Sequence, residues 1–244
     1  MERNSLLVSL VAVFASLNVV CDSFVGIPQF TEGVWYSWIF VIEPLTGIVL
    51  GPYAGFLSTL IGAMVGHFIY FRGIHEFLFT IGAPVGAMVS GLLFRRKWKI
   101  VFIYFTMLFI AYFATPIAWQ LPIWGMWDTY CAYAGLCMMA LIATKKKAGE
   151  LETRGLSYNL PINAIIGLEA DILFRIFLFI PCQTYRLIYG FTIEDLRYIW
   201  LAGALITPIQ VAISALVTSM VGIPLIKTLK KAGYFLYMFE WDRE

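Results

Sequence analysis

Charged residues are scarce in this chain. Asp, Glu, Lys and Arg make up only 13% of its 244 residues, whereas about 25% is usual in a soluble domain. Hydrophobic residues make up 61% and aromatic residues 17%. This composition excludes an ordinary soluble globular domain. Because long apolar stretches must satisfy their backbone groups internally in lipid, we expect an all-α integral membrane protein.

Residues and motifs for enzyme chemistry are also few. The chain has two histidines and four cysteines, and it contains no His-Glu zinc motif, phosphate-binding loop or nucleophile elbow. Its net charge of +2 gives no argument for a nucleic-acid partner. We therefore expect no enzyme activity, no catalytic residues, no metal and no cofactor.

Eight apolar stretches approach the roughly 20 residues that a helix needs to span a bilayer. They cover residues 6–21, 34–50, 53–71, 74–94, 100–119, 123–144, 161–180 and 198–226. The last is long and contains Pro208, which predicts a kink or a tilt. We expect one multi-pass transmembrane domain over residues 1–244, in the cell membrane.

Basic residues predict the orientation, because they accumulate on the cytoplasmic side. If the N-terminus is inside, thirteen Lys and Arg residues lie in inner segments and three in outer segments. Both termini are therefore predicted to be cytoplasmic. Arg175 is the basic residue left within a span.

Small residues recur at every fourth position in three stretches, a spacing that lets helices approach closely in lipid. Two sets predict tight packing inside the chain: Ser58, Gly62 and Gly66, and Ala83, Ala87 and Gly91. The first stretch has the pairs Ser5 with Ser9 and Ala12 with Ser16. A terminal helix is more often peripheral, so we expect this last set to dock another membrane protein.

The first third of the chain resembles the substrate-binding S components of energy-coupling factor transporters. The resemblance rests on the small-residue face of the first stretch, on VGIPQF at residues 25–30, and on GPYAGFLSTLIGAMVG from residue 51. Ala12 and Ser16 match the family's Ala-xxx-Ala stripe with one Ala replaced. Gly51, Pro52 and Gly55 match its Gly-Pro-xx-Gly segment.

The resemblance implies a subunit that binds a small molecule and works with a membrane T component and two ATPases supplied by other chains. In that family the small-residue stripe contacts the T component. Family members commonly have six helices, so a six-helix core is the alternative to eight. The second half of the chain matches no substrate-specific signature of the family.

The segment GLEADILFRIFL at residues 167–178 places three charges within an apolar stretch. On a helix, Asp171 and Arg175 lie about 40° apart and can pair, whereas Glu169 lies about 160° from Asp171. A charge near the bilayer centre costs at least ~2.5–3.5 kcal/mol. A helix that is polar on two sides must therefore run through the middle of the bundle. Asp171 and Arg175 are interpreted either as a structural pair or as ligand-binding residues.

Glu169 has no partner on its own helix. The candidates are His67, Glu43, Gln210 or a substrate, and two central carboxyl groups, Glu43 and Glu169, could share a proton or bind a cation. Pro44 follows Glu43 and would loosen the helix there, either around a ligand or as a simple kink. His67 is interpreted as a hydrogen-bond donor or as a residue lining a site.

Aromatic residues gather at the outer ends of two stretches, which is typical of a membrane-interface belt. Within WGMWDTY at residues 124–130, Asp128 is an acid among aromatic rings and could hold a planar, cationic or hydrogen-bonding ligand. The other stretch has Trp35, Tyr36 and Trp38 at its outer end, and Gln29 lies in the outer loop before it. Together these residues could cap a pocket that opens outward.

These features predict a membrane protein that binds a small molecule, vitamin-like or another micronutrient, in its outer half. Two other functions remain open. The chain could be an autonomous ion- or proton-coupled carrier that uses Glu43, Glu169 and Asp171. It could also be a non-transporting structural subunit of a membrane complex.

Overall fold

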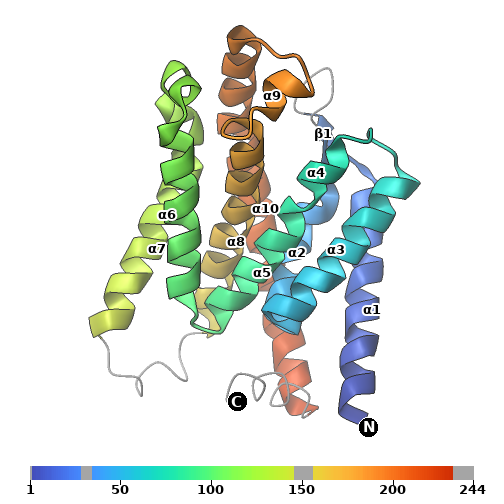
Figure 1. The fold of residues 1–244 in the computed structure, drawn as a ribbon. Helices are drawn as coiled ribbons and strands as arrows, with labels where there is room; N and C mark the ends of the chain where they lie inside the picture. The colour runs from blue at the N-terminus through green and yellow to red at the C-terminus, as the bar shows by residue number, and fades with distance from the viewer. Residues whose placement is uncertain (1, 29–34, 146–155, 233–244) are drawn as a thin grey trace.

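A computed structural model describes residues 2–28, 35–145 and 156–232 of the chain (Figure 1). The helices are α1 (Glu2–Ser23), α2 (Glu43–Leu50), α3 (Pro52–Ile69), α4 (Glu76–Thr80), α5 (Gly82–Phe94), α6 (Trp98–Ala114), α7 (Trp127–Lys145), α8 (Leu156–Phe179), α9 (Thr184–Leu187) and α10 (Ile193–Lys231). Three short 3₁₀ helices are η1 (Trp38–Val41), η2 (Pro116–Gln120) and η3 (Ile123–Met126). The strands β1 (Val25–Pro28) and β2 (Trp35–Ser37) pair antiparallel.

The predicted all-α architecture is confirmed apart from this short two-stranded ribbon. Within the described residues, four segments are long and apolar enough to cross a membrane: Ser5–Ser23, Pro52–Ile69, Glu76–Phe94 and Ile193–Lys231. Helix α6 is apolar but shorter. The start of α1 and the end of α10 lie at the same end of the bundle, opposite α9 (Figure 1). The count of eight spans and the cytoplasmic termini stay predictions, and by the distribution of basic residues we name the α9 end the outer end.

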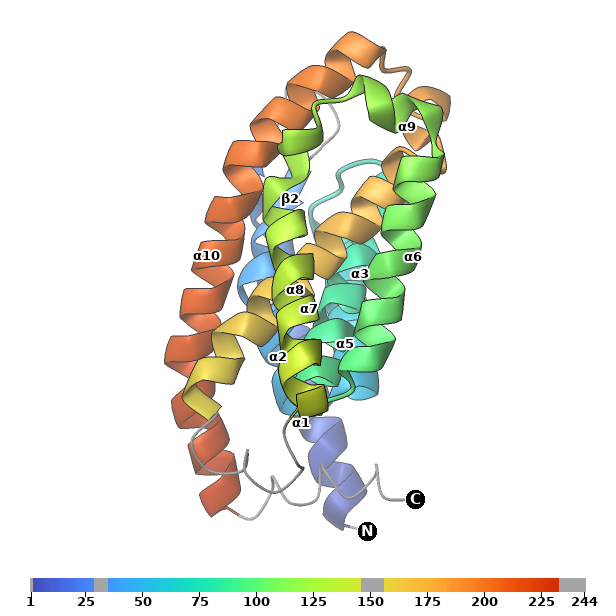
Figure 2. The same cartoon turned by 90° about the vertical axis from the view of Figure 1, so that its left-hand side faces the viewer.

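The second apolar stretch, residues 34–50, was predicted as one helix, and this prediction was wrong. Its described residues, 35–50, form β2, then η1, and only then the eight-residue α2. Pro44 lies in the first turn of α2, where a missing N–H leaves no hydrogen bond unmade. Pro44 therefore begins a helix and does not kink one. In contrast, α10 continues through Pro208 and Pro224 over 39 residues and runs the full height of the bundle (Figure 2).

The small residues of α3 pack against α1, as the spacing predicts. The Ser58 hydroxyl donates to the Val11 carbonyl at 3.0 Å. A side chain at Gly62 would collide with Asn18, and one at Gly66 would collide with Asp22. Helix α1 therefore lies directly on the small-residue face of α3.

Helix α5 meets a different neighbour on each of two faces. A side chain at Gly91 would strike the backbone of Gly47 and Pro52, so this face lies against α2 and the start of α3. The face with Gly82 and Gly86 lies against α8. The second small-residue set therefore also serves packing inside the chain.

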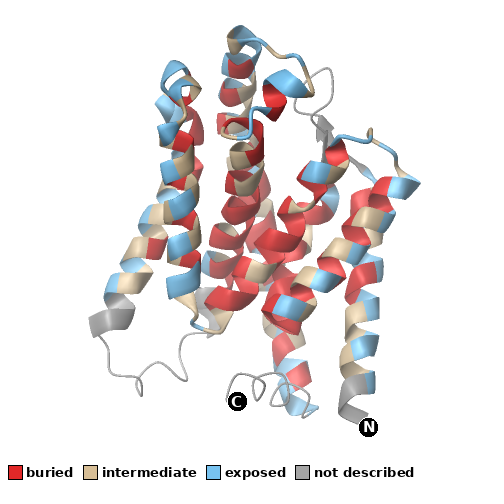
Figure 3. Ribbon diagram, in the orientation of Figure 1, coloured by how far each residue is buried: buried red, intermediate tan, exposed pale blue. Residues whose placement is uncertain are grey.

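Helix α8 occupies the centre of the bundle. It contacts α2, α5, α6, α7 and α10, and its residues from Ala164 to Leu173 are almost all buried (Figure 3). Buried residues concentrate on α5 and α8, while α1, α6 and α10 carry exposed apolar faces (Figure 3). This central position confirms the prediction made from the charges of α8.

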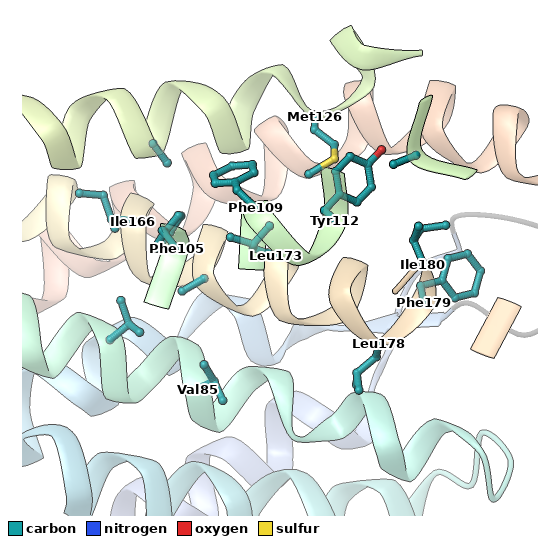
Figure 4. Close-up of a cluster of buried hydrophobic side chains, with 14 of the residues drawn as sticks. Val85, Phe105, Phe109, Tyr112, Met126, Ile166, Leu173, Leu178, Phe179 and Ile180 are labelled. Atoms are coloured by element: carbon teal, nitrogen blue, oxygen red, sulfur yellow. The ribbon is translucent and has the colours of Figure 1, made fainter. Parts of the chain in front are cut away.

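A cluster of aromatic and aliphatic side chains fills the space between α5, α6, α7 and α8 (Figure 4). Phe105, Phe109 and Tyr112 of α6 lie toward Ile166 and Leu173 of α8 (Figure 4). These side chains hold the α6–α7 pair against the central helix on the side opposite α3.

Gly47 tests the close packing of α2 on α5. A side chain there would collide with the backbone carbonyl of Ala87, which cannot move aside as a side chain can. We expect Gly47→Ala to lower the free energy of unfolding by about 1–3 kcal/mol, measured as a lower thermal midpoint in detergent. Gly135→Ala is the control, because Gly135 of α7 has open space around its Cα. Equal midpoints for the two variants would contradict the packing described.

Candidate functional site

The predicted ion pair within α8 is present. Arg175 Nε donates to Asp171 Oδ1 at 2.6 Å, and Arg175 Nη2 donates to Asp171 Oδ2 at 3.0 Å. The pair lies against α5, where a side chain at Gly82 would occupy the position of Asp171 Oδ1. Asp171 is only 3% exposed. The glycine on α5 thus makes room for a two-pronged ion pair in the interior.

Glu43 is the first residue of α2 and lies near the Asp171–Arg175 pair. Its side chain is fully buried, and neither carboxyl oxygen has a hydrogen-bond partner among the described residues. It packs onto Gly86 and interacts electrostatically with Asp171 and Arg175. Because an unpartnered ionised carboxylate is costly to bury, this position favours the neutral acid.

Glu169 lies on the opposite side of α8, as the helical geometry predicts, and its Oε1 has no hydrogen-bond partner among the described residues. Its Oε2 accepts a hydrogen bond of 2.8 Å from the Thr129 hydroxyl of α7. None of the candidates His67, Glu43 and Gln210 makes a hydrogen bond to it in the described structure. The Thr129 hydroxyl is the partner because α7 packs on the face of α8 that carries Glu169.

Asp128 stands beside Thr129 at the start of α7. Its carboxylate accepts a hydrogen bond from the Thr207 hydroxyl of α10 and one of 3.0 Å from the Thr129 backbone N–H. Asp128 and Glu169 also interact electrostatically. Polar groups of α7, α8 and α10 therefore meet on this side of the central helix.

His67 lies near the outer end of α3 and is fully buried. Its Nε2 faces the Gly73 carbonyl at 3.0 Å, and its ring packs on Phe77 with centroids 4.1 Å apart. Nearby, Arg72 forms an ion pair with Asp22 of α1. This ion pair ties the connection after α3 to α1.

A first cavity, the outer cavity, has a volume of about 90 Å³ and lies between α4, the outer part of α8, η3 with the start of α7, and α10. Its walls are mainly apolar and aromatic. Its charged and hydroxyl-bearing lining residues are Glu76, Asp128, Thr129, Arg175, Tyr189 and Thr207.

A second cavity, which we call the inner cavity because it is more enclosed, is smaller, with a volume of about 20 Å³, and its lining is more polar. It also includes residues from the outer end of the bundle, such as His67 and Arg72. Ile172, Arg175 and Glu76 line both cavities. The two cavities are therefore neighbours that share one wall of α8 and α4.

The predicted binding residues divide between these cavities. Asp128 and Arg175 line the outer cavity, whereas the inner cavity is lined by His67, Asp171, Arg175 and Gln210. Glu43 and Glu169 line neither. Gln29 lies outside the described residues. The predicted docking residues Ser5, Ser9, Ala12 and Ser16 are all exposed on α1.

Four charged or phenolic residues of the cavities were not predicted: Asp22, Arg72, Glu76 and Tyr189. Tyr189 donates a 2.6 Å hydrogen bond to Glu76 Oε1. Burial and the negative charge of Glu76 raise the pKa of Tyr189, which keeps the phenol a donor. Asp22 and Arg72 could have been noticed as charges at the ends of apolar stretches. Their pairing could not be predicted, because the two residues lie 50 positions apart in the sequence.

No family model, curated protein or solved structure matches this chain. Within the described residues, no three His, Cys, Asp or Glu side chains converge as they would to hold a metal ion.

The ion pair of α8 can be tested by removing one partner. We expect Arg175→Met to lower the free energy of unfolding by about 3–5 kcal/mol, because it leaves Asp171 buried without its counter-charge. The double variant Asp171→Leu with Arg175→Met should recover most of this loss, since no bare charge remains. The measurement is thermal and chemical unfolding in detergent. A double variant no more stable than Arg175→Met would contradict the view that the uncompensated charge of Asp171 causes the loss.

Proposed function

We propose that this protein is a membrane-embedded substrate-binding subunit for the uptake of a small molecule, vitamin-like or another micronutrient. In this proposal it acts with an ATP-driven module of a membrane T component and two ATPases. The observation that carries the proposal is the outer cavity, an apolar space with a few convergent polar groups near one end of a helical bundle. Such cavities are typical of small-molecule sites.

The size and lining of the outer cavity support a small organic ligand. One water molecule needs roughly 10–15 Å³ of such space, so a cavity of about 90 Å³ has room for several non-hydrogen atoms. Phe79, Phe179 and Trp200 offer ring surfaces, and Asp128 and Thr207 stand at the wall formed by α7 and α10. This combination suits a flat molecule with at least one polar group.

The exposed face of α1 supports the partner proposal. Ser9 and Ser16 bond back to the carbonyls of Ser5 and Ala12 at 2.9 Å each, so their hydroxyls are turned onto their own helix. The face is therefore smooth, with small side chains, while the opposite face of α1 packs on α3. A smooth face of this kind lets a second membrane helix approach closely.

Glu43 favours a second candidate, an autonomous ion- or proton-coupled carrier. An unpartnered buried carboxyl group next to the Asp171–Arg175 pair can gain and lose a proton as its surroundings change. The two candidates differ in partners: the carrier works alone, and the subunit purifies with two ATPases and a second membrane protein.

Filling the outer cavity tests where the ligand binds. Gly203 of α10 lines the cavity, and open space surrounds the position that a side chain would take. We expect Gly203→Leu to fold normally and to lose at least ten-fold of any small molecule that copurifies with the unaltered protein. The measurement is mass spectrometry of small molecules extracted from both purified proteins. Gly135→Leu is the matched control, and equal retention in all three proteins would contradict a ligand in this cavity.

Blocking the smooth face of α1 tests the partner proposal. Ala12→Leu with Ser16→Leu should abolish copurification of the T component and the ATPases, because the bulky side chains fill the surface that a partner helix would approach. Mass spectrometry of proteins purified from the native membrane in mild detergent measures this. Val13→Leu with Val20→Leu is the control on the same helix. An unaltered protein that purifies alone, in a detergent that preserves known complexes, would favour the autonomous carrier.

A further inference from the structure

The inner cavity collects polar side chains from five helices, from β2 and from the connection after α3. Its lining includes Asp22 of α1, His67 of α3, Arg72 from the connection after α3, Glu76 of α4, Asp171 and Arg175 of α8, and Gln210 of α10. A volume of about 20 Å³ leaves room for little more than one water molecule. A substrate of the size that the outer cavity accepts does not fit here.

Three nitrogen atoms of this lining have no hydrogen-bond partner among the described residues. They are Nδ1 of His67, Nε of Arg72 and Nε2 of Gln210. His67 is fully buried, Gln210 is 1% exposed, and the Arg72 side chain is 7% exposed. Buried polar atoms are nearly always paired, so three such atoms around one small space indicate that something polar occupies it.

The hydrogen bond of His67 fixes which ring nitrogen is available. A carbonyl oxygen can only accept, so Nε2 donates its proton to Gly73. In the neutral ring Nδ1 then carries a lone pair. Nδ1 is the atom of this ring that can take up a proton.

The charges around the cavity do not balance. Three carboxyl groups, those of Asp22, Glu76 and Asp171, face the two guanidinium groups of Arg72 and Arg175. Glu76 also accepts a hydrogen bond from Tyr189, which does not change the charge. Beyond the lining, Glu43 interacts with Asp171 but favours the neutral acid. A single added proton would make this buried compartment neutral, and neutrality is strongly favoured away from water.

We propose that the inner cavity is a proton-binding site in which Nδ1 of His67 carries one exchangeable proton. The negative charge that acts on His67 comes from Asp22, and Glu76 lines the same cavity on the other side of the connection that holds Arg72. Arg72 and Gln210 line the same cavity, and their unpartnered nitrogens can donate to a water molecule held there. Because Arg175 and Glu76 also line the outer cavity, the proton lies next to the space assigned to the substrate.

Histidine signals in nuclear magnetic resonance spectra test this proposal directly, because the chain has only two histidines. The protein is labelled with ¹³C-histidine, held in detergent micelles and titrated between pH 5 and 9. We expect the His67 signal to titrate in this range. Asp22→Asn should move its midpoint to lower pH by about one unit, a tenfold loss of proton affinity, because it removes a charge that stabilises the imidazolium. Glu76→Gln should move the midpoint in the same direction by a smaller amount, because Glu76 lines the same cavity.

Two controls accompany the titration. His67→Gln assigns the signal, because only the signal of the exposed His75 then remains. Glu194→Gln makes the same chemical change as Glu76→Gln at an exposed position of α10 and should move neither signal. If Asp22→Asn fails to fold because it breaks the pair with Arg72, Glu76→Gln decides the question. A His67 signal that does not titrate, or that titrates with the same midpoint in the variants, would overturn the proposal.

Discussion

The ion pair between Asp171 and Arg175 is the constraint around which the interior is arranged. Two charges can stay within an apolar bundle only if they satisfy each other and are shielded from lipid. This requirement places α8 at the centre, with α5 on one side and α7 and α10 on the other. It also requires a glycine on α5, since any side chain at Gly82 would displace the carboxylate of Asp171.

Close packing of small residues supports this arrangement. Glycines let α1, α2, α3, α5 and α8 approach until backbone atoms nearly touch, so the N-terminal half forms a compact layer against the central helix. On the other side, bulky aromatic residues of α6 and α7 fill a wider gap (Figure 4). The two kinds of packing leave polar groups to gather where they meet, along α8.

The two cavities differ in the chemistry that they offer, although they share Arg175 and Glu76. The outer cavity is roomy and aromatic and suits an organic molecule. The inner cavity is small, is lined by several charged groups and suits a proton with a water molecule. In a membrane protein, a change of charge in one compartment changes the electrostatic field in the next, because little solvent screens it. The proposed substrate and proton sites therefore lie close enough to influence each other.

The sequence alone determined the membrane class, the apolar segments, the pairing within α8 and the small-residue faces that pack inside the chain. These features follow from composition and from helical periodicity, which show the face on which a residue lies. Only the tertiary structure decided which helix each face meets. It joined Glu169 to Thr129, Asp22 to Arg72 and Glu76 to Tyr189, pairs 40, 50 and 113 residues apart. It also replaced the predicted second span by a strand, a 3₁₀ turn and a short helix, because Pro44 suits the first turn of a helix better than its middle.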